Sequence, residues 1–157
     1  MTRTARVVAG VAIAAAAGIA TFAVMASRAI TIEQAAPEAA MRRFEAVRAA
    51  SDGAPPLLVR DAGGRLVRNP QAPPPRAGAI RHLFVLAWRA GARRLVHADV
   101  PFWFFRLKAP AAQFLVRDTG FDLRTLGVTA DDLARQGPGL VLDEADGAGN
   151  RVAIWTE

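Results

Sequence analysis

Cysteine and tyrosine are absent from the 157 residues of this chain, and serine occurs only at Ser27 and Ser51. Without cysteine the chain forms no disulfide, thiolate metal site or thiol nucleophile, which excludes thiol redox enzymes and zinc fingers. Ser27 lies at the edge of an apolar stretch and Ser51 lies beside Gly53, so neither serine fits the rigid turn of a serine hydrolase. His82 and His97 are therefore the only side chains expected to titrate near neutral pH.

Positive charge prevails but is unevenly distributed. The chain has 20 basic and 14 acidic residues, and its net charge is +6. Residues 1–27 contribute +2, residues 28–110 contribute +8 from 14 basic and 6 acidic side chains, and residues 111–157 contribute −4 from 4 basic and 8 acidic ones. No cluster of bases alternates with stacking aromatics, so we expect a basic face near solvent or membrane and no nucleic-acid partner.

The N-terminal region contains an apolar stretch of membrane-spanning length. Residues 7–25 carry no charge and follow Arg3 and Arg6. As a helix this stretch would be about 28 Å long, close to the thickness of a bilayer core. Its length favours a retained transmembrane anchor over residues 1–28, because the apolar core of a cleaved signal is usually shorter. Residues 24–26 would nevertheless also suit a signal peptidase that cuts before Ser27.

The flanks and the small residues of this stretch predict its orientation and its contacts. The preceding arginines favour a cytoplasmic N-terminus, so we expect a single-pass protein of the cell inner membrane with an extracytoplasmic C-terminal domain. Gly10, Ala14 and Gly18 recur every four residues, a stripe that lets another helix approach closely, although such spacing also arises by chance in so alanine-rich a segment. The expected partners are the lipid bilayer and a membrane protein or a second copy.

After the anchor, residues 29–52 predict an amphipathic juxtamembrane helix. Thr31 and Gln34 have the spacing of a capping box, whereas Pro37 better suits the first turn of a helix that runs to about Ala50. The apolar face of this helix comprises Ala40, Phe44 and Val47.

Residues 53–157 predict a small α+β domain built from antiparallel hairpins and short helices. The residues at 69–76 include four prolines and predict an extended surface loop. Thr129 and Asp132 form a capping box that starts a helix, which ends at Gly137, and a further short helix is expected at 110–116. The expected strand pairs are 57–59 with 66–67, 83–88 with 95–100, and 139–143 with 151–155.

Four aromatic residues occur in succession at 102–105. We expect a core strand there, with Trp103 or Phe105 partly exposed. The residues expected to contact a partner are Phe102, Trp103, Phe105 and Arg106.

A second candidate site depends on the register of the hairpin around Gly91. If Leu86 lies opposite His97, then Phe84 lies opposite Asp99, and His82, His97 and Asp99 share one face. Two imidazoles and a carboxylate can bind a metal or carry acid–base chemistry, although the two histidines would be about 13 Å apart along the strands.

Two other patterns have simpler explanations. The carboxylates Asp118, Asp122, Asp131 and Asp132 lie at expected helix starts, which accounts for them without glycoside chemistry. Residues 126–129 resemble the turn of a helix-turn-helix motif only superficially, because acidic residues follow where DNA phosphates would lie.

These observations predict a single-pass, membrane-anchored accessory or interaction protein of a bacterial envelope complex, without catalytic activity or cofactor. One alternative is a membrane-tethered hydrolase or metal-dependent enzyme that uses His82, His97 and Asp99. Another is a periplasmic binding domain released by signal cleavage. A pocket joining the three polar side chains would favour the enzyme, whereas a flat, exposed aromatic strip would favour the interaction protein.

Overall fold

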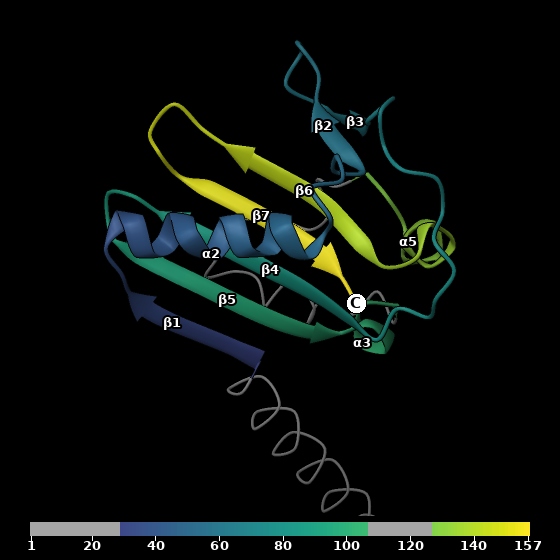
Figure 1. The fold of residues 1–157 in the computed structure, drawn as a ribbon, viewed down its shortest axis with the longest axis horizontal. Coiled ribbons are helices and arrows are strands. Elements are labelled where there is room, and N and C mark those ends of the chain that lie inside the picture. Colours follow the sequence, from purple (N-terminus) through teal and green to yellow (C-terminus); the bar gives the residue numbers. More distant parts are fainter. Residues whose placement is uncertain (1–28, 107–126) are drawn as a thin grey trace, which may run out of the picture.

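The computed structural model of the chain describes residues 29–106 and 127–157. In these ranges a five-stranded antiparallel sheet, in the order β1-β5-β4-β7-β6, is accompanied by the β2–β3 hairpin and three helices (Figure 1). The elements are β1 Ile30–Gln34, α2 Pro37–Ala50, β2 Leu58–Arg60, β3 Leu66–Arg68, β4 His82–Arg89, β5 Arg94–Pro101, α3 Phe102–Arg106, α5 Ala130–Gln136, β6 Gly139–Ala145 and β7 Arg151–Thr156.

The α+β class with antiparallel hairpins and short helices is confirmed, and all three predicted strand pairs are present. Gly10, Ala14 and Gly18 of the expected anchor lie outside the described residues, as does the helix expected at 110–116. Within the described ranges, no helix combines the length and the apolar character needed to span a bilayer.

Strand β4 lies in the middle of the sheet, between β5 and β7. Its apolar run is buried on both faces: Leu83 and Val85 on one side and Leu86 and Trp88 on the other are each no more than 2 % exposed. This is the environment that an unbroken apolar strand predicts. The strand therefore joins two hydrophobic clusters, one on each face of the sheet.

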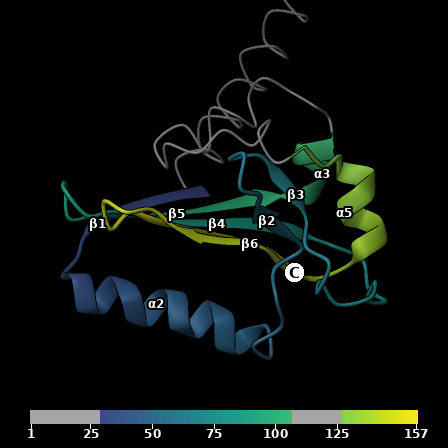
Figure 2. The ribbon, with the colours of Figure 1, turned by 90° about the horizontal axis from the view of Figure 1, so that it is seen from above.

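Helix α2 covers one face of the sheet, and α3 lies toward the other (Figure 2). Pro37 occupies its first turn, as expected, and Ala40 and Phe44 are buried against Leu86, Trp88, Leu95 and Ala153. Val47 is partly buried at the same cluster. The amphipathic face of this helix is thus packed on the sheet and shares a core with the strands.

The prediction of helix for the residues before Pro37 is wrong. Ile30–Gln34 form strand β1, which pairs with β5 from Ile30 opposite Ala98 to Gln34 opposite Arg94. The capping-box spacing of Thr31 and Gln34 is overridden because Ile30, Thr31 and Ile32 are β-branched and fit a pleated strand beside β5.

The prediction of a core strand at 102–105 is also wrong, because these residues begin helix α3. The ladder ends where Phe102 donates its N–H to Arg81 O at 2.8 Å, and the preceding Pro101 has no N–H to offer. The turn into α3 buries Phe102 and Phe104 and leaves Trp103 56 % exposed. The expectation that Trp103 or Phe105 is partly exposed is confirmed, since Phe105 is also only partly buried.

The start of α5 matches its sequence signal. Thr129 Oγ1 accepts a hydrogen bond from the Asp132 N–H at 3.1 Å, and Thr129 N–H donates to Asp132 Oδ2 at 2.9 Å. The backbone N–H and hydroxyl of Thr129, together with Arg135, lower the pKa of Asp132 to about 2. Asp132 is thereby accounted for as a capping residue.

Replacing Thr129 with alanine should destabilise the protein by about 1 kcal/mol, since it removes an N-cap side chain. The pKa of Asp132 should rise from about 2 toward 3.8, because one of its hydrogen bonds is lost. The ionised carboxylate stabilises the fold above the unfolded pKa, and that stabilisation is lost as pH falls through the folded pKa. Thermal unfolding and an NMR titration of the carboxyl carbon test this, and Thr129→Ser should stay close to wild type. Equal losses in both variants would contradict the capping explanation.

Candidate functional site

Part of the sheet face that carries α2 holds five partly exposed side chains from three strands. We call this group the aromatic shelf; it consists of His82, Phe84, His97, Asp99 and Trp155. The β4–β5 hairpin has the register on which the second candidate site depends, with Leu86 opposite His97 and Phe84 opposite Asp99. Strand β7 adds Trp155, which lies opposite Phe84.

The rings of the shelf are close and nearly parallel. The Phe84 ring centroid is 5.2 Å from that of Trp155 and 5.8 Å from that of His97, and the interplanar angles are 17° and 3°. The His97 and Trp155 centroids are 5.9 Å apart, and His82 lies 5.7 Å from Phe84 on the other side. The contact between Phe84 and Trp155 contributes about 0.5 to 1.5 kcal/mol beyond burial. The shelf is therefore a preorganised strip of four rings.

His82 and Asp99 form the polar end of the shelf. His82 Nδ1 lies 2.5 Å from Asp99 Oδ1, and the two side chains are 43 % and 41 % exposed. The carboxylate fixes the orientation of the imidazole and leaves Nε2 as the nitrogen that can meet a ligand. A His–Asp pair of this kind can act as a general base when a substrate or nucleophile reaches Nε2.

His97 lies at the other end of the strip and is not bonded to the pair. Burial lowers its pKa, and Arg43 lowers it further, against the opposing effect of Asp99 and Glu33. Neutral His97 therefore behaves as an aromatic member of the strip near pH 7. The Phe84 ring lies between the two imidazoles.

The chemistry expected of His82, His97 and Asp99 as one group is only partly assembled. In the described ranges no three His, Cys, Asp or Glu side chains are arranged to hold a metal ion. Among the same residues, the Ser51 hydroxyl donates to Val47 O at 3.1 Å and is buried, so it is not placed as a nucleophile for His82. The structure thus brings His82 to Asp99 and leaves His97 apart.

The four residues expected to contact a partner do not form one strip. Phe102 is buried, and Phe105 packs against it with ring centroids 6.0 Å apart. Trp103 projects outward and meets Phe104 edge to face. Arg106 is exposed and lies 3.6 Å from Asp131. Only Trp103 and Arg106 therefore present substantial surface to solvent.

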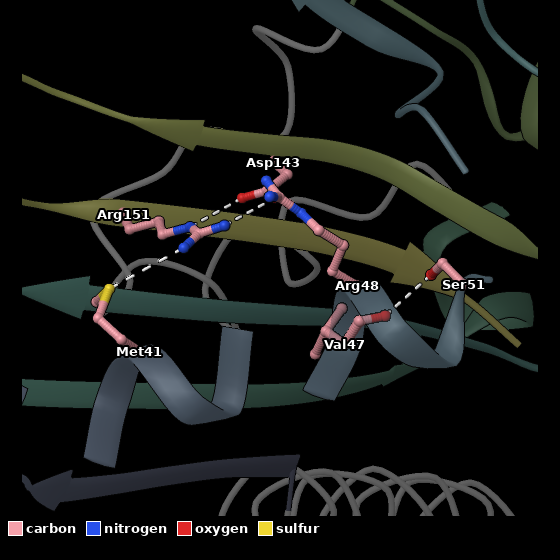
Figure 3. A network of polar contacts seen from close by, with 6 residues as sticks. All are labelled: Met41, Val47, Arg48, Ser51, Asp143 and Arg151. Atoms are coloured by element: carbon pink, nitrogen blue, oxygen red, sulfur yellow. Dashed lines mark hydrogen bonds and ion pairs between the residues drawn. The ribbon is translucent and has the colours of Figure 1, made fainter. Parts of the chain in front are cut away.

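Sequence reasoning missed a buried polar network that holds α2 on the sheet (Figure 3). Arg151 donates from Nε and Nη2 to the two carboxylate oxygens of Asp143, both at 2.9 Å. Arg48 of α2 donates from Nη2 to Oδ2 of the same carboxylate at 2.5 Å. The Arg151 guanidinium also lies 4.9 Å from the centre of the Phe44 ring, and its Nη1 lies 4.0 Å from Met41 Sδ.

Only one part of this network had a signal in the sequence. Asp143 and Arg151 are opposite charges on the two strands of a predicted hairpin, which makes a cross-strand pair foreseeable. Arg48 lies 95 residues from Asp143, so nothing local indicates their contact. The same holds for Trp155, which joins the shelf only through the pairing of β7 with β4.

Comparison with known proteins adds no assignment: no protein-family model, no curated protein and no solved structure matches the chain.

Proposed function

We propose that this chain is a single-pass, membrane-anchored accessory or interaction protein of a bacterial envelope complex, without catalytic activity of its own. Residues 1–28 supply the anchor, with the N-terminus in the cytoplasm, and the domain outside the inner membrane binds a partner. Two arginines before an uncharged stretch of membrane-spanning length support the anchor and its orientation.

The aromatic shelf is the observation that carries the binding role. Its four rings are stacked before any ligand arrives, so little side-chain entropy remains to be lost when a partner covers them. Aromatic residues also dominate the binding energy of many protein interfaces. Exposed Trp103 and Arg106 of α3 offer a second, smaller contact. The proposal therefore places the main contact at Phe84, His97 and Trp155.

Carbonate extraction of membranes tests the anchor, and a pull-down in mild detergent tests the binding role. The full-length tagged chain should remain with the membranes after carbonate extraction, and mass spectrometry should identify proteins that copurify with it. Phe84→Ala should reduce that recovery by about tenfold or more, as for a hot-spot side chain. Val67→Ala is the control, because it removes an exposed apolar side chain of the β2–β3 hairpin, which the proposal does not use as a contact.

Three results would contradict the proposal. Recovery of the full-length chain in the supernatant would exclude the anchor, and a mature N-terminus at Ser27 would support the secreted binding domain instead. Equal recovery of the copurifying proteins with wild type and Phe84→Ala would exclude the shelf as the contact surface. Circular dichroism on each variant ensures that a lost partner does not reflect a lost fold.

The contact between His82 and Asp99 favours a second candidate, a membrane-tethered hydrolase. Its metal-dependent form has less support, since the described residues contain no three-residue ligand group. A hydrolase should cleave p-nitrophenyl esters or phosphates, and His82→Ala should lower that rate by about a hundredfold or more. Asp99→Asn should also slow the reaction, because the imidazole loses its orienting carboxylate. An interaction protein gives no turnover above buffer in either variant or in wild type.

A further inference from the structure

The two edge strands of the main sheet, β6 and β1, differ in how they are protected from pairing with a further strand. At the β6 edge, Leu57 donates its N–H to Leu140 O at 3.0 Å, and the strand register shifts between Leu140 and Leu142. Arg60 of the β2–β3 hairpin forms two hydrogen bonds with Glu144, at 3.1 and 2.8 Å. A covering segment, a bulge and an ion pair are devices that prevent an edge from pairing with another chain.

Strand β1, at the opposite edge, has no bulge and, among the described residues, no covering segment. It pairs with β5 over five consecutive residues without a bulge, and it contains no proline or lysine. Ile32, at its centre, is 48 % exposed. Its one acidic residue, Glu33, is already paired with Arg43 of the same chain at 2.9 Å. An exposed, regular strand with an apolar centre is a template for pairing with a further strand.

The direction of the free backbone groups follows from the β1–β5 register. Ala35 donates its N–H to Arg93 O at 3.1 Å, which continues the pairing of Gln34 with Arg94. Residues along a strand alternate in the side to which they direct N–H and C=O. Thr31 and Glu33 therefore face β5, whereas the backbone groups of Ile30, Ile32 and Gln34 point to the open edge. None of those groups has a hydrogen-bond partner among the described residues.

We infer that the β1 edge pairs with β1 of a second copy of this chain, antiparallel and centred on Ile32. In this register Ile32 faces its own copy, Ile30 faces Gln34, and Thr31 faces Glu33. The outward-pointing residues then meet one another and form about six backbone hydrogen bonds. The exposed Ile32 side chains of the two copies become neighbours and bury each other.

Strand β1 is complementary to a second copy of itself, and the register centred on Ile32 pairs the most residues. Five residues of each strand are paired, whereas centring on Thr31 or Glu33 pairs only three, and centring on Glu33 also places two carboxylates opposite each other. Like charges in directly opposed positions destabilise a sheet. The resulting interface is isologous, and its two-fold axis is perpendicular to the sheet. Both aromatic shelves therefore lie on the same side of the dimer.

Single-cysteine crosslinking of the full-length chain tests this interface without interference, since the chain has no cysteine of its own. In Ile32→Cys the two Cα atoms are expected about 5.5 Å apart, within the range of a disulfide. Oxidation in detergent or in membranes should convert most of this variant to a covalent dimer. In Thr31→Cys the two cysteines are offset by two residues along the strands and their Cα atoms are about 8 Å apart, so the dimer yield should be several-fold lower.

Two further variants test the register. Ile30→Cys and Gln34→Cys should each stay monomeric when oxidised alone, and a mixture of the two, carrying different tags, should form the mixed disulfide. Val67→Cys is the control for random collisions, because Val67 is 38 % exposed on the separate β2–β3 hairpin. Circular dichroism checks that each variant folds like wild type.

The inference is overturned if oxidised Ile32→Cys remains monomeric or if Val67→Cys dimerises to the same extent. Equal yields from Thr31→Cys and Ile32→Cys would also overturn it, since they would indicate parallel or unspecific association. The pairing between copies uses β1 alone, which contains no residue of the anchor or the aromatic shelf, so its failure would leave both of those proposals untouched.

Discussion

Replacing Asp143 with alanine is expected to destabilise the protein by about 3 kcal/mol, because it leaves a poorly solvated arginine without its carboxylate. The Asp143 side chain is 6 % exposed and that of Arg151 is 16 % exposed, whereas Arg48 is 58 % exposed and can turn to water. The loss should therefore arise mainly from Arg151, and Arg48→Ala should cost only about 1 kcal/mol. Denaturant unfolding of the full-length chain in detergent measures these differences.

Two comparisons make this expectation specific. In a double-mutant cycle, Asp143→Ala combined with Arg151→Ala should cost less than the sum of the single losses, since the charges are removed together. Asp131→Ala is a control on the surface, where the carboxylate is 74 % exposed and lies 3.6 Å from Arg106; it should change stability by less than about 1 kcal/mol. Additive losses in the cycle would show that the buried pair is not coupled.

The stability that Asp143 contributes with Arg151 and Arg48 should depend on pH. Burial raises the pKa of Asp143, but the hydrogen bonds from Arg151 and Arg48 outweigh it, so the folded pKa lies below the ordinary 3.8. A depressed carboxyl pKa stabilises the fold above the unfolded value, and this stabilisation is lost as pH falls through the folded value. The difference in stability between wild type and Asp143→Asn should shrink below about pH 4. A difference that does not change with pH would exclude the ionised carboxylate as the stabilising group.

Gly137→Ala is expected to destabilise the protein by about 3 to 4 kcal/mol. Gly137 follows α5 with φ 79° and ψ −170°, a region that is essentially restricted to glycine. A Cβ atom at this position would lie 2.0 Å from Arg76 O. The proline-rich loop is held there by the hydrogen bond from Arg76 N–H to Gln136 O at 2.8 Å, so the clash pushes the loop away from the end of α5.

Gly149→Ala separates the effect of backbone conformation from that of the clash. Gly149 has φ 80°, but the nearest atom to an added Cβ is Ala90 Cβ at an ordinary 3.5 Å. This variant should cost only about 1 to 2 kcal/mol. Thermal unfolding of both variants tests the comparison, and equal losses would show that contact with Arg76 is unimportant.

The sequence predicted the elements that depend on residues close together in the chain. The apolar run of β4 predicted a central strand, and the turn around Gly91 predicted that this strand pairs with β5 in a hairpin. The capping box of Thr129 and Asp132 located the start of α5. These predictions hold because each signal depends on residues that are close in the chain, so little loop entropy opposes the contact.

Tertiary structure decided the short and ambiguous segments. Residues 30–34 satisfy a weak capping pattern, but they become a strand because β5 offers a partner for Thr31 and Glu33. Residues 102–105 are apolar throughout. They form a helix because the β4–β5 ladder ends at Phe102 and because the turn buries Phe102 and Phe104 in the core. Neither constraint is visible in five residues of sequence.

The sequence by itself predicted the three hairpins and the start of α5, and it placed His82 and Asp99 on one face only for one of the possible registers of the β4–β5 hairpin. Only the tertiary structure decided that Trp155 completes the shelf, that Arg48 reaches Asp143, and that β1 becomes the open edge of the sheet. The physical reason is the same in each case. A local pattern sets which faces are apolar, whereas contacts between distant segments depend on how all of those faces are buried together.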